Sequence, residues 1–306
     1  MIDLTILGTG GSIPMPNRHL ASAVIKYKGR KILIDCGEGT QVSMRKNNIG
    51  FKTIDIICIT HYHGDHIIGL PGLLSTIGNS GREEPLTIIG PEGISDILKG
   101  LLVVTPYLPY ELRVIDNPQS TIEIDTPYFN KEILIHTMKL DHSSPCIGYK
   151  FELKRAPRFS VEKATVNNVP KVLWGKLQKL NDKIEYEGKT YTKDMVLGED
   201  RQGINLSYIT DTLFFENIIP FIKGSDLFIC EGNYGNEEDK EKAIQNKHMT
   251  FKEAATLALK GEVEKLILTH FSAAMDNPAE FIDNAKNIFN NSIVGYDGYS
   301  LTINFK

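Results

Sequence analysis

The 306-residue chain contains 41% hydrophobic and 24% charged residues, an ordinary globular composition that excludes disordered and fibrous proteins. Its net charge of -4 gives no sign of nucleic-acid binding by the chain as a whole. No apolar run reaches the ~18 residues of a membrane span, and no basic segment precedes the first β-rich run, so we expect a cytoplasmic protein with no membrane partner.

The first third of the chain predicts short strands separated by glycine-rich turns. The β-rich runs cover residues 4–7, 23–27, 31–34 and 55–60. The last of these runs is almost continuously apolar, which is typical of a strand buried on both faces. Two helices with start and stop signals are predicted at residues 67–77 and 91–102.

Strands and helices alternate again in the last part of the chain. Further strands are predicted near residues 132–139, 206–210, 226–230 and 265–269. Helices are predicted at residues 251–259 and 278–289, on either side of the last strand. This alternation favours an α/β protein in which helices cover layered sheets.

A polar and basic segment at residues 155–203 interrupts this alternation. Residues 150–193 hold 11 Lys and Arg against 5 Asp and Glu, a net charge of +6, whereas the rest of the chain has a net charge of -10. We interpret residues 155–203 as an inserted arm of an otherwise single domain. A solvated, lysine-rich surface is the alternative interpretation.

Four metal-ligand side chains lie close together directly after the buried strand at residues 55–60. His61, His63, Asp65 and His66 place three imidazoles and a carboxylate within six residues. A loop need not follow helix or strand periodicity, so these groups can converge on a metal ion. The alternative is a solvated histidine-rich turn or buried histidines with satisfied hydrogen bonds.

Three more candidate ligands each follow a predicted strand: His142, Asp211 and His270. Strand ends of a layered α/β protein gather at one edge, so ligands from distant parts of the sequence can meet there. Five imidazoles and two carboxylates exceed the capacity of one tetrahedral zinc ion. The sequence therefore predicts two divalent ions at a catalytic site, with Zn²⁺ preferred and Mn²⁺ as the alternative.

These residues resemble the ligand set of the metallo-β-lactamase superfamily. Within it, the chain resembles ribonuclease Z, a family of endonucleases that trim tRNA 3′ ends, over nearly its whole length. The segments that carry this resemblance are residues 7–10 (LGTG), 35–41 (DCGEGTQ), 63–66 (HGDH) and 69–74 (GLPGLL). The resemblance implies an αββα sandwich with a basic arm inserted and a dimetal site at the edge of the sandwich.

The resemblance also implies a role for each candidate residue. One ion would be held by His61, His63 and His142, and the other by Asp65, His66 and His270, with Asp211 as the bridge. Glu231 and His248 match a glutamate and a histidine that assist proton transfer outside the metal shell. From the residues alone, Glu231 is as well explained as a turn cap and His248 as a neighbour of a helix N-cap.

The expected reaction is two-metal hydrolysis of a phosphodiester bond in a tRNA precursor. Asp65 would orient the attacking hydroxide while it binds metal, and His248, held by Glu231, would protonate the departing 3′ oxygen. The resemblance implies that the arm clamps tRNA and that the protein is a homodimer.

Two other functions stay open at this point. The first is hydrolysis of a small phosphodiester or other small molecule. It stays open because the family usually has Ser-x-Arg-Tyr after the histidine that corresponds to His270, whereas this chain has Ser272-Ala273-Ala274-Met275. The missing cation removes a phosphate contact. The second is a non-catalytic RNA-binding module, against which the complete ligand set argues.

Overall fold

The computed structural model describes residues 1–119, 121–179 and 183–306. Its backbone divides into two compact units, one formed by Met1–Glu152 with Ile204–Asn304 and the other by Leu153–Gly203 with Phe305–Lys306. Within the described residues, every helix is too short or too polar to span a bilayer.

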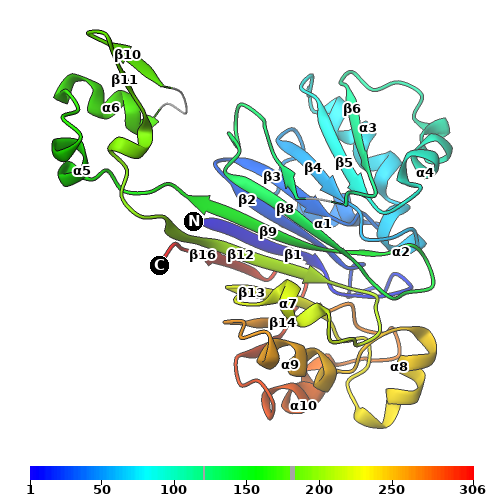
Figure 1. Ribbon diagram of the computed structural model, residues 1–306. Helices are drawn as coiled ribbons and strands as arrows, with labels where there is room; N and C mark the ends of the chain where they lie inside the picture. Colours follow the sequence, from blue (N-terminus) through cyan, green and yellow to red (C-terminus); the bar gives the residue numbers. More distant parts are fainter. Residues whose placement is uncertain (120, 180–182) are drawn as a thin grey trace. The chain divides into compact units, whose positions relative to one another are not determined.

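Seven strands form the first large sheet of the larger unit, in the order β16-β1-β2-β3-β4-β5-β6 (Figure 1). Their bounds are Ile2–Gly8 (β1), Ser22–Tyr27 (β2), Arg30–Ile34 (β3), Ile54–Cys58 (β4), Leu86–Gly90 (β5), Leu112–Asp116 (β6) and Ser300–Ile303 (β16). Strands β3 to β6 run parallel to one another, whereas β16, β1, β2 and β3 pair antiparallel.

The second large sheet also has seven strands, in the order β15-β14-β13-β12-β9-β8-β7. Their bounds are Ile122–Glu123 (β7), Ile133–Lys139 (β8), Ile147–Arg155 (β9), Arg201–Ile209 (β12), Leu227–Glu231 (β13), Leu266–Thr269 (β14) and Ser292–Val294 (β15). Strands β12 to β15 are parallel, so their carboxyl ends lie at the same edge of the sheet.

Helices cover the outer face of each sheet (Figure 1). The first sheet is covered by Thr40–Lys46 (α1), Gly64–Ile67 (α2), Leu70–Asn79 (α3) and Ile94–Leu101 (α4), which continues into Leu102–Val104 (η1). The second is covered by Ile218–Ile222 (α7), Phe251–Lys260 (α9), Pro278–Phe281 (η4) and Ile282–Lys286 (α10), whereas Glu237–Asp239 (η3) and Lys240–Asn246 (α8) form a connection between β13 and α9. A separate apolar cluster fills the space between helices and strands on each side. The predicted αββα sandwich is confirmed.

The two sheets also contact each other through their buried faces. Tyr149 on β9 is fully buried, and its hydroxyl lies 2.7 Å from the carbonyl oxygen of Ile59, directly after β4, and 3.1 Å from that of Ile89 on β5. A buried phenol needs a hydrogen-bond partner, so this contact fixes where the sheets meet.

The smaller unit contains the segment that we expected to be an arm. Its elements are Val161–Val166 (α5), Lys171–Lys179 (α6), Ile184–Tyr186 (β10), Lys189–Tyr191 (β11) and Lys193–Met195 (η2). Val169, Leu173 and Leu177 recur at a spacing of four and pack with Ala164 into a small core. Apolar residues at helical spacing therefore give this polar and basic segment a small core of its own. Residues 180–182 of the expected arm lie outside the described residues.

One predicted helix is divided in two. Residues 67–77 were expected to be continuous, but α2 ends at Ile67 and α3 begins at Leu70. Gly69 lies between them because a β-carbon at this position would be 2.1 Å from the carbonyl oxygen of Gly37. This close contact ties the α2–α3 junction to the loop after β3.

Candidate metal centre

The predicted ligands follow the carboxyl ends of four strands, in loops except for Asp65 and His66, which lie in the short helix α2. His61 follows β4, His142 follows β8, Asp211 follows β12 and His270 follows β14. These loops come from both sheets, and the structure brings the ligands together at one edge of the sandwich, as predicted from the positions of the strands.

The backbone at the site adopts an uncommon conformation. Asp35, Asp211 and His270 have φ angles of 57°, 55° and 55°, in the left-handed region. For residues with a β-carbon this conformation costs about 1–2 kcal/mol each, and such strain concentrates at functional sites. The sharp turns after β3, β12 and β14 place these side chains at the site.

The first group of candidate ligands consists of His61, His63, His142 and Asp211. His63 Nδ1 lies 3.1 Å from His61 Nε2 and 3.2 Å from His142 Nε2. Asp211 Oδ2 is 3.6 Å from His61 Nε2 and 3.7 Å from His142 Nε2. Four donor atoms so close together can bind one ion between them.

The second group consists of Asp65, His66 and His270, beside the other oxygen of Asp211. His66 Nε2 and His270 Nε2 are 3.1 Å apart, and Asp65 Oδ2 lies 3.3 Å and 3.5 Å from them. Asp211 Oδ1 lies 3.7 Å from His66 Nε2 and 3.2 Å from His270 Nε2. All seven predicted ligands thus lie together, and the two oxygens of Asp211 face different groups.

A buried carboxylate orients the imidazoles of the HxHxDH loop. Asp35 Oδ2 accepts from His66 Nδ1 at 2.8 Å, which leaves Nε2 available to a metal. Thr60 donates its hydroxyl to Asp35 at 2.8 Å, and its oxygen lies 3.1 Å from His61 Nδ1. No role for Asp35 was predicted from the sequence, although this residue begins the DCGEGTQ segment directly after β3.

The electrostatics of His61, His142 and the two carboxylates suit metal ligands, whereas at His66 the Asp211 and Asp35 carboxylates outweigh burial and raise the pKa. Burial lowers the pKa of His61 and His142, which favours neutral imidazole. Burial alone would raise the pKa values of Asp65 and Asp211, but neighbouring imidazoles, above all those of His270 and His66, outweigh it and lower both. Neutral imidazole and ionised carboxylate are the forms that bind divalent metal.

Glu231 and His248 lie beside this cluster. Fully buried Glu231 accepts from the Thr212 backbone N–H at 2.7 Å and lies 2.9 Å from His248 Nδ1. The His248 ring centre is 5.3 Å from that of His142 and 5.5 Å from that of His270. Burial lowers the pKa of His248, but the Glu231 carboxylate outweighs it and raises this pKa to about 9. The raised pKa favours the protonated form of His248 at neutral pH.

Two residues near the N-terminus, Ser12 and Arg18, form hydrogen bonds to residues of the site, and these contacts were not predicted from the sequence. The backbone N–H of Ser12 donates to Asp65 Oδ2 at 2.7 Å. The Arg18 guanidinium donates to the carbonyls of Ser272 at 3.2 Å and Met275 at 2.7 Å, in the loop after His270. These contacts join segments that are far apart in the sequence, so no local sequence pattern predicts them.

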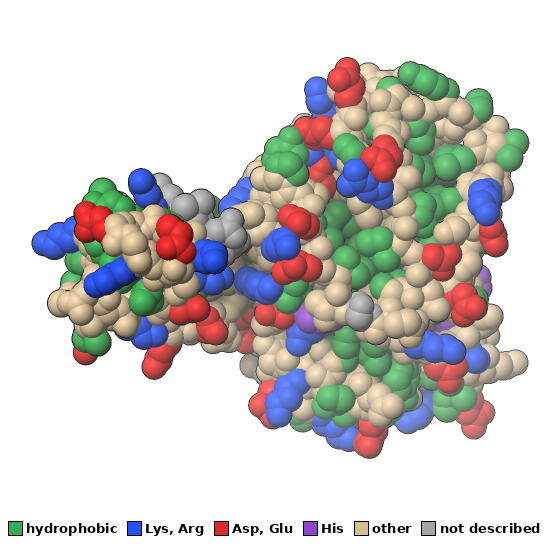
Figure 2. All heavy atoms as spheres, turned by 45° about the horizontal axis from the view of Figure 1, so that its top comes forward, with side chains coloured by type: hydrophobic (Ala, Val, Ile, Leu, Met, Phe, Trp, Pro, Cys, Tyr) green, Lys and Arg blue, Asp and Glu red, His purple; other side chains and the backbone are tan. Residues whose placement is uncertain are grey.

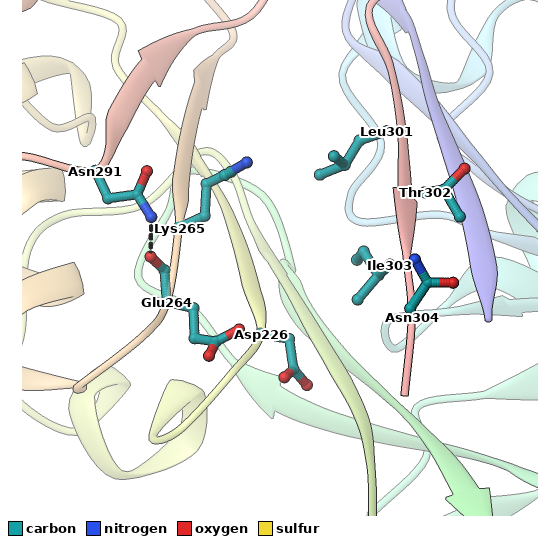
Figure 3. A pocket seen from close by; sticks show the side chains of 8 residues that line it. All are labelled: Asp226, Glu264, Lys265, Asn291, Leu301, Thr302, Ile303 and Asn304. Carbon is teal, nitrogen blue, oxygen red and sulfur yellow. Dashed lines mark hydrogen bonds between the residues drawn. The ribbon is translucent and has the colours of Figure 1, made fainter. Parts of the chain in front are cut away.

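A cavity of about 470 Å³ lies away from these ligands, at the amino ends of β13 and β14 and beside β16 (Figure 3). Its lining residues are Asp226, Glu264, Lys265, Asn291, Leu301, Thr302, Ile303 and Asn304. None of these described residues is a predicted ligand. The candidate chemistry therefore belongs to the opposite, carboxyl ends of these strands.

The chain is similar to known proteins over its whole length. It is 59% identical over 305 residues to ribonuclease Z from Clostridium beijerinckii, covering 100% of this chain and 99% of that protein. Among solved structures, the metallo-β-lactamase fold protein YhfI from Bacillus subtilis matches with a TM-score of 0.70 at 18% identity, covering 98% of each chain. The short form of human tRNase Z matches with a TM-score of 0.69 at 23% identity, covering 99% of this chain and 100% of that one. A family model described as anti-Pycsar protein Apyc1 matches residues 2–104, less than half of the chain.

Proposed function

Because the chain belongs to the ribonuclease Z family, we propose that it is an endoribonuclease that cleaves tRNA precursors at the 3′ end. The observation that carries this proposal is the 59% identity to a ribonuclease Z over the whole of this chain. The cluster of seven histidine and aspartate ligands supplies chemistry that suits phosphodiester hydrolysis.

The donor set fits two divalent ions. One is assigned to His61, His63 and His142, the other to Asp65, His66 and His270, with Asp211 between them. Support comes from the two Asp211 oxygens, which face the two groups separately. Imidazole and carboxylate without thiolate suit Zn²⁺, with Mn²⁺ as the alternative. When bound, such ions supply an acidified water nucleophile and neutralise negative charge on the phosphoryl oxygens.

The protein's own side chains orient the nucleophile and protonate the leaving group. Asp65 orients the attacking water through a carboxylate whose Oδ2 is held by the Ser12 N–H. His248, protonated beside Glu231, donates its proton to the departing 3′ oxygen. A positioned general acid contributes about two to four powers of ten in rate. The products are a tRNA with a 3′ hydroxyl and a 5′-phosphorylated trailer.

The smaller unit is assigned to tRNA binding. Residues 150–193 carry a net charge of +6, and lysine and arginine contacts to phosphates gain free energy from counterion release. Figure 2 shows basic and acidic side chains interspersed over this unit. We therefore expect separate lysine–phosphate contacts in place of one continuous basic patch.

We assign the protein to the cytoplasm as a homodimer. Val103, Val104 and Tyr107, next to α4, are 75%, 77% and 79% exposed, and exposed apolar side chains so close together are typical of a protein interface. The four cysteines are buried with free thiols, which suits a reducing compartment.

The test is incubation of the metal-loaded protein with a defined tRNA precursor, followed by mapping of the cut. We expect cleavage at the 3′ end of the tRNA, and its loss in His63→Ala and Asp65→Ala, because each removes a metal ligand. If the precursor stays intact while bis(p-nitrophenyl) phosphate is hydrolysed, the tRNA assignment is wrong and the hydrolytic chemistry survives. RNA binding without turnover under either metal would indicate a non-catalytic module.

Hydrolysis of a small phosphodiester is the second candidate. It is favoured by the uncharged loop Ser272–Met275 after His270, where the family carries an arginine. Salt dependence separates the two candidates. A polyanion held by several cations loses affinity steeply with salt, whereas a small substrate does not.

A further inference from the structure

Lys247 contacts the candidate metal ligand His142 and directly precedes the candidate proton donor His248. No function has been assigned to Lys247 above. It ends helix α8 in the left-handed conformation, with φ 56° and ψ 52°. Glycine or asparagine usually occupies this position, because a β-carbon disfavours the conformation. A lysine at this position suggests that its side chain makes contacts that glycine could not make.

The backbone carbonyl and the side-chain ammonium of Lys247 both contact the loop that contains His142. The Lys247 carbonyl lies 3.2 Å from His142 Nδ1, so it accepts the ring N–H and leaves Nε2 free to face the first ligand group. The Lys247 ammonium pairs with Asp141 at 2.7 Å and donates to the His142 carbonyl at 3.3 Å. One residue therefore fixes the orientation of the imidazole and the position of its backbone.

The Lys247–Asp141 pair also closes a ring of contacts around the site. The Asp141 N–H donates to the Thr212 hydroxyl at 3.0 Å, and the Thr212 N–H donates to Glu231 at 2.7 Å. Glu231 binds His248 at 2.9 Å, and His248 is the next residue after Lys247. The ring thus connects the loop of His142 to the imidazole of His248 by two routes.

From this geometry we propose that Lys247 is a positioning residue, which holds the metal ligand His142 and the proton donor His248 in fixed relative positions. This proposal rests on the metal site proposed above. An exposed ion pair alone contributes little to stability. Here the pair acts through the geometry of a metal ligand, where loss of an outer partner commonly weakens metal binding by about 10–100-fold.

The test compares Lys247→Met, Lys247→Arg and the control Lys242→Met. Lys242 lies on the same helix and pairs with Asp239 at 2.8 Å, on the surface and outside this ring. The first readout is zinc affinity of the metal-free protein, titrated against a chelating indicator, which needs no activity. The second is the split between kcat and KM for precursor cleavage.

We expect wild-type protein to bind two ions and Lys247→Met to bind one of them about tenfold more weakly, at the lower end of the range because the carbonyl remains. We expect kcat to fall with KM unchanged, Lys247→Arg to restore both readouts, and Lys242→Met to match wild type. Asp141→Asn should reproduce Lys247→Met, and the double variant should be no weaker than either.

Two outcomes would overturn the proposal and are distinguishable. If wild type binds two ions and Lys247→Met binds both with wild-type affinity and unchanged kcat, Lys247 is only a helix cap. If wild type itself binds fewer than two ions, the dimetal site fails and the Lys247 proposal fails with it.

Discussion

A buried carboxylate determines whether the candidate proton donor carries its proton. His248 is mostly buried, which alone would favour the neutral ring, but Glu231 raises its pKa to about 9. Glu231 is held in turn by the N–H of Thr212, so it cannot turn away from the imidazole. The protonation state of one residue thus depends on a second residue and on a backbone contact of a third.

We predict that Glu231→Gln lowers the pKa of His248, because burial is then opposed by Asp211, whose effect is smaller than that of Glu231. The alkaline limb of the kcat/KM profile for precursor cleavage should move to lower pH, since His248 must be protonated to donate. Hydrolysis of bis(p-nitrophenyl) phosphate should change little, because p-nitrophenolate leaves without a proton. Activity measured from pH 6 to pH 10 checks both statements.

The matched control is Glu238→Gln, at an exposed glutamate on η3. It removes the same charge without contact to His248 and should leave the profile unchanged. Superimposable profiles for Glu231→Gln and wild type would contradict the proton-donor assignment.

At the scale of elements, the site depends on how closely two loops approach. A β-carbon on Gly37 would lie 1.9 Å from the carbonyl oxygen of Asp65, and one on Gly69 would lie 2.1 Å from the carbonyl oxygen of Gly37. The loop after β3 and the α2–α3 junction therefore pack backbone against backbone. This contact places Asp35 and the ligand Asp65 in the same site.

We predict that Gly37→Ala separates these loops. Overpacking of this kind costs about 1–3 kcal/mol, and we expect the free energy of unfolding to fall by that amount. One bound ion should also be weakened, because Asp65 moves with its backbone. Denaturant unfolding and metal titration of the same sample measure the two effects.

Gly100→Ala is the comparison, within helix α4. No heavy atom lies within 4 Å of a β-carbon built at Gly100. Alanine is better than glycine inside a helix by about 0.5–1 kcal/mol, so this variant should be as stable as wild type or more so. A Gly37→Ala protein that binds both ions normally would show that this loop contact does not control the site.

For the whole molecule, charge is distributed unevenly along the chain. The segment with a net charge of +6 lies almost wholly in the smaller unit, whereas the rest of the chain has a net charge of -10. The net negative charge of the rest of the chain repels tRNA, so we expect the affinity for tRNA to come from the basic segment. Substrate binding and hydrolysis are then separable by mutation.

We predict that replacing Lys163, Lys176 and Lys189 by Gln weakens tRNA binding and makes it less sensitive to salt. These side chains are exposed. If each contacts one phosphate, the magnitude of the slope of log K against log salt should decrease by about 2–3, since each contact contributes about 0.7–0.9. Hydrolysis of bis(p-nitrophenyl) phosphate should be unaffected. Filter binding at several salt concentrations gives the slope.

The same number of charges is removed from the larger unit in a control with Lys52, Lys99 and Lys286 replaced by Gln. All three are exposed. If this control reduces the slope as much as the first set, tRNA does not bind preferentially to the smaller unit.

Subunit assembly gives a second prediction for the whole molecule. Val104→Asp places a charge among the exposed apolar residues next to α4 and should convert a dimer into monomers, as measured by sedimentation velocity. Val166→Asp, at a residue of α5 that is 73% exposed, should leave the dimer intact. A dimer that survives Val104→Asp would place the interface elsewhere.

Local pattern was enough to find all candidate ligands and the strands that precede them. The apolar runs at residues 55–60 and 206–210 predicted strands that end beside His61 and Asp211, and β4 and β12 end there within two residues. The positions of these strands and turns depend on the hydrophobicity and turn preferences of residues that are neighbours in the sequence. Elements that were not predicted are the strands β5, β6, β7, β9, β15 and β16, the helices α1, α7 and α8 and the elements of the smaller unit.

The folded structure determines which groups from distant parts of the sequence meet. Asp35 binds a histidine 31 residues away, and the Lys247 carbonyl binds His142 at a separation of 105 residues. The structure also separates the ligands into two groups, because each oxygen of Asp211 faces a different set. Composition and spacing determine which side chains can bind metal, whereas the packing of two sheets and their loops determines where each lone pair points.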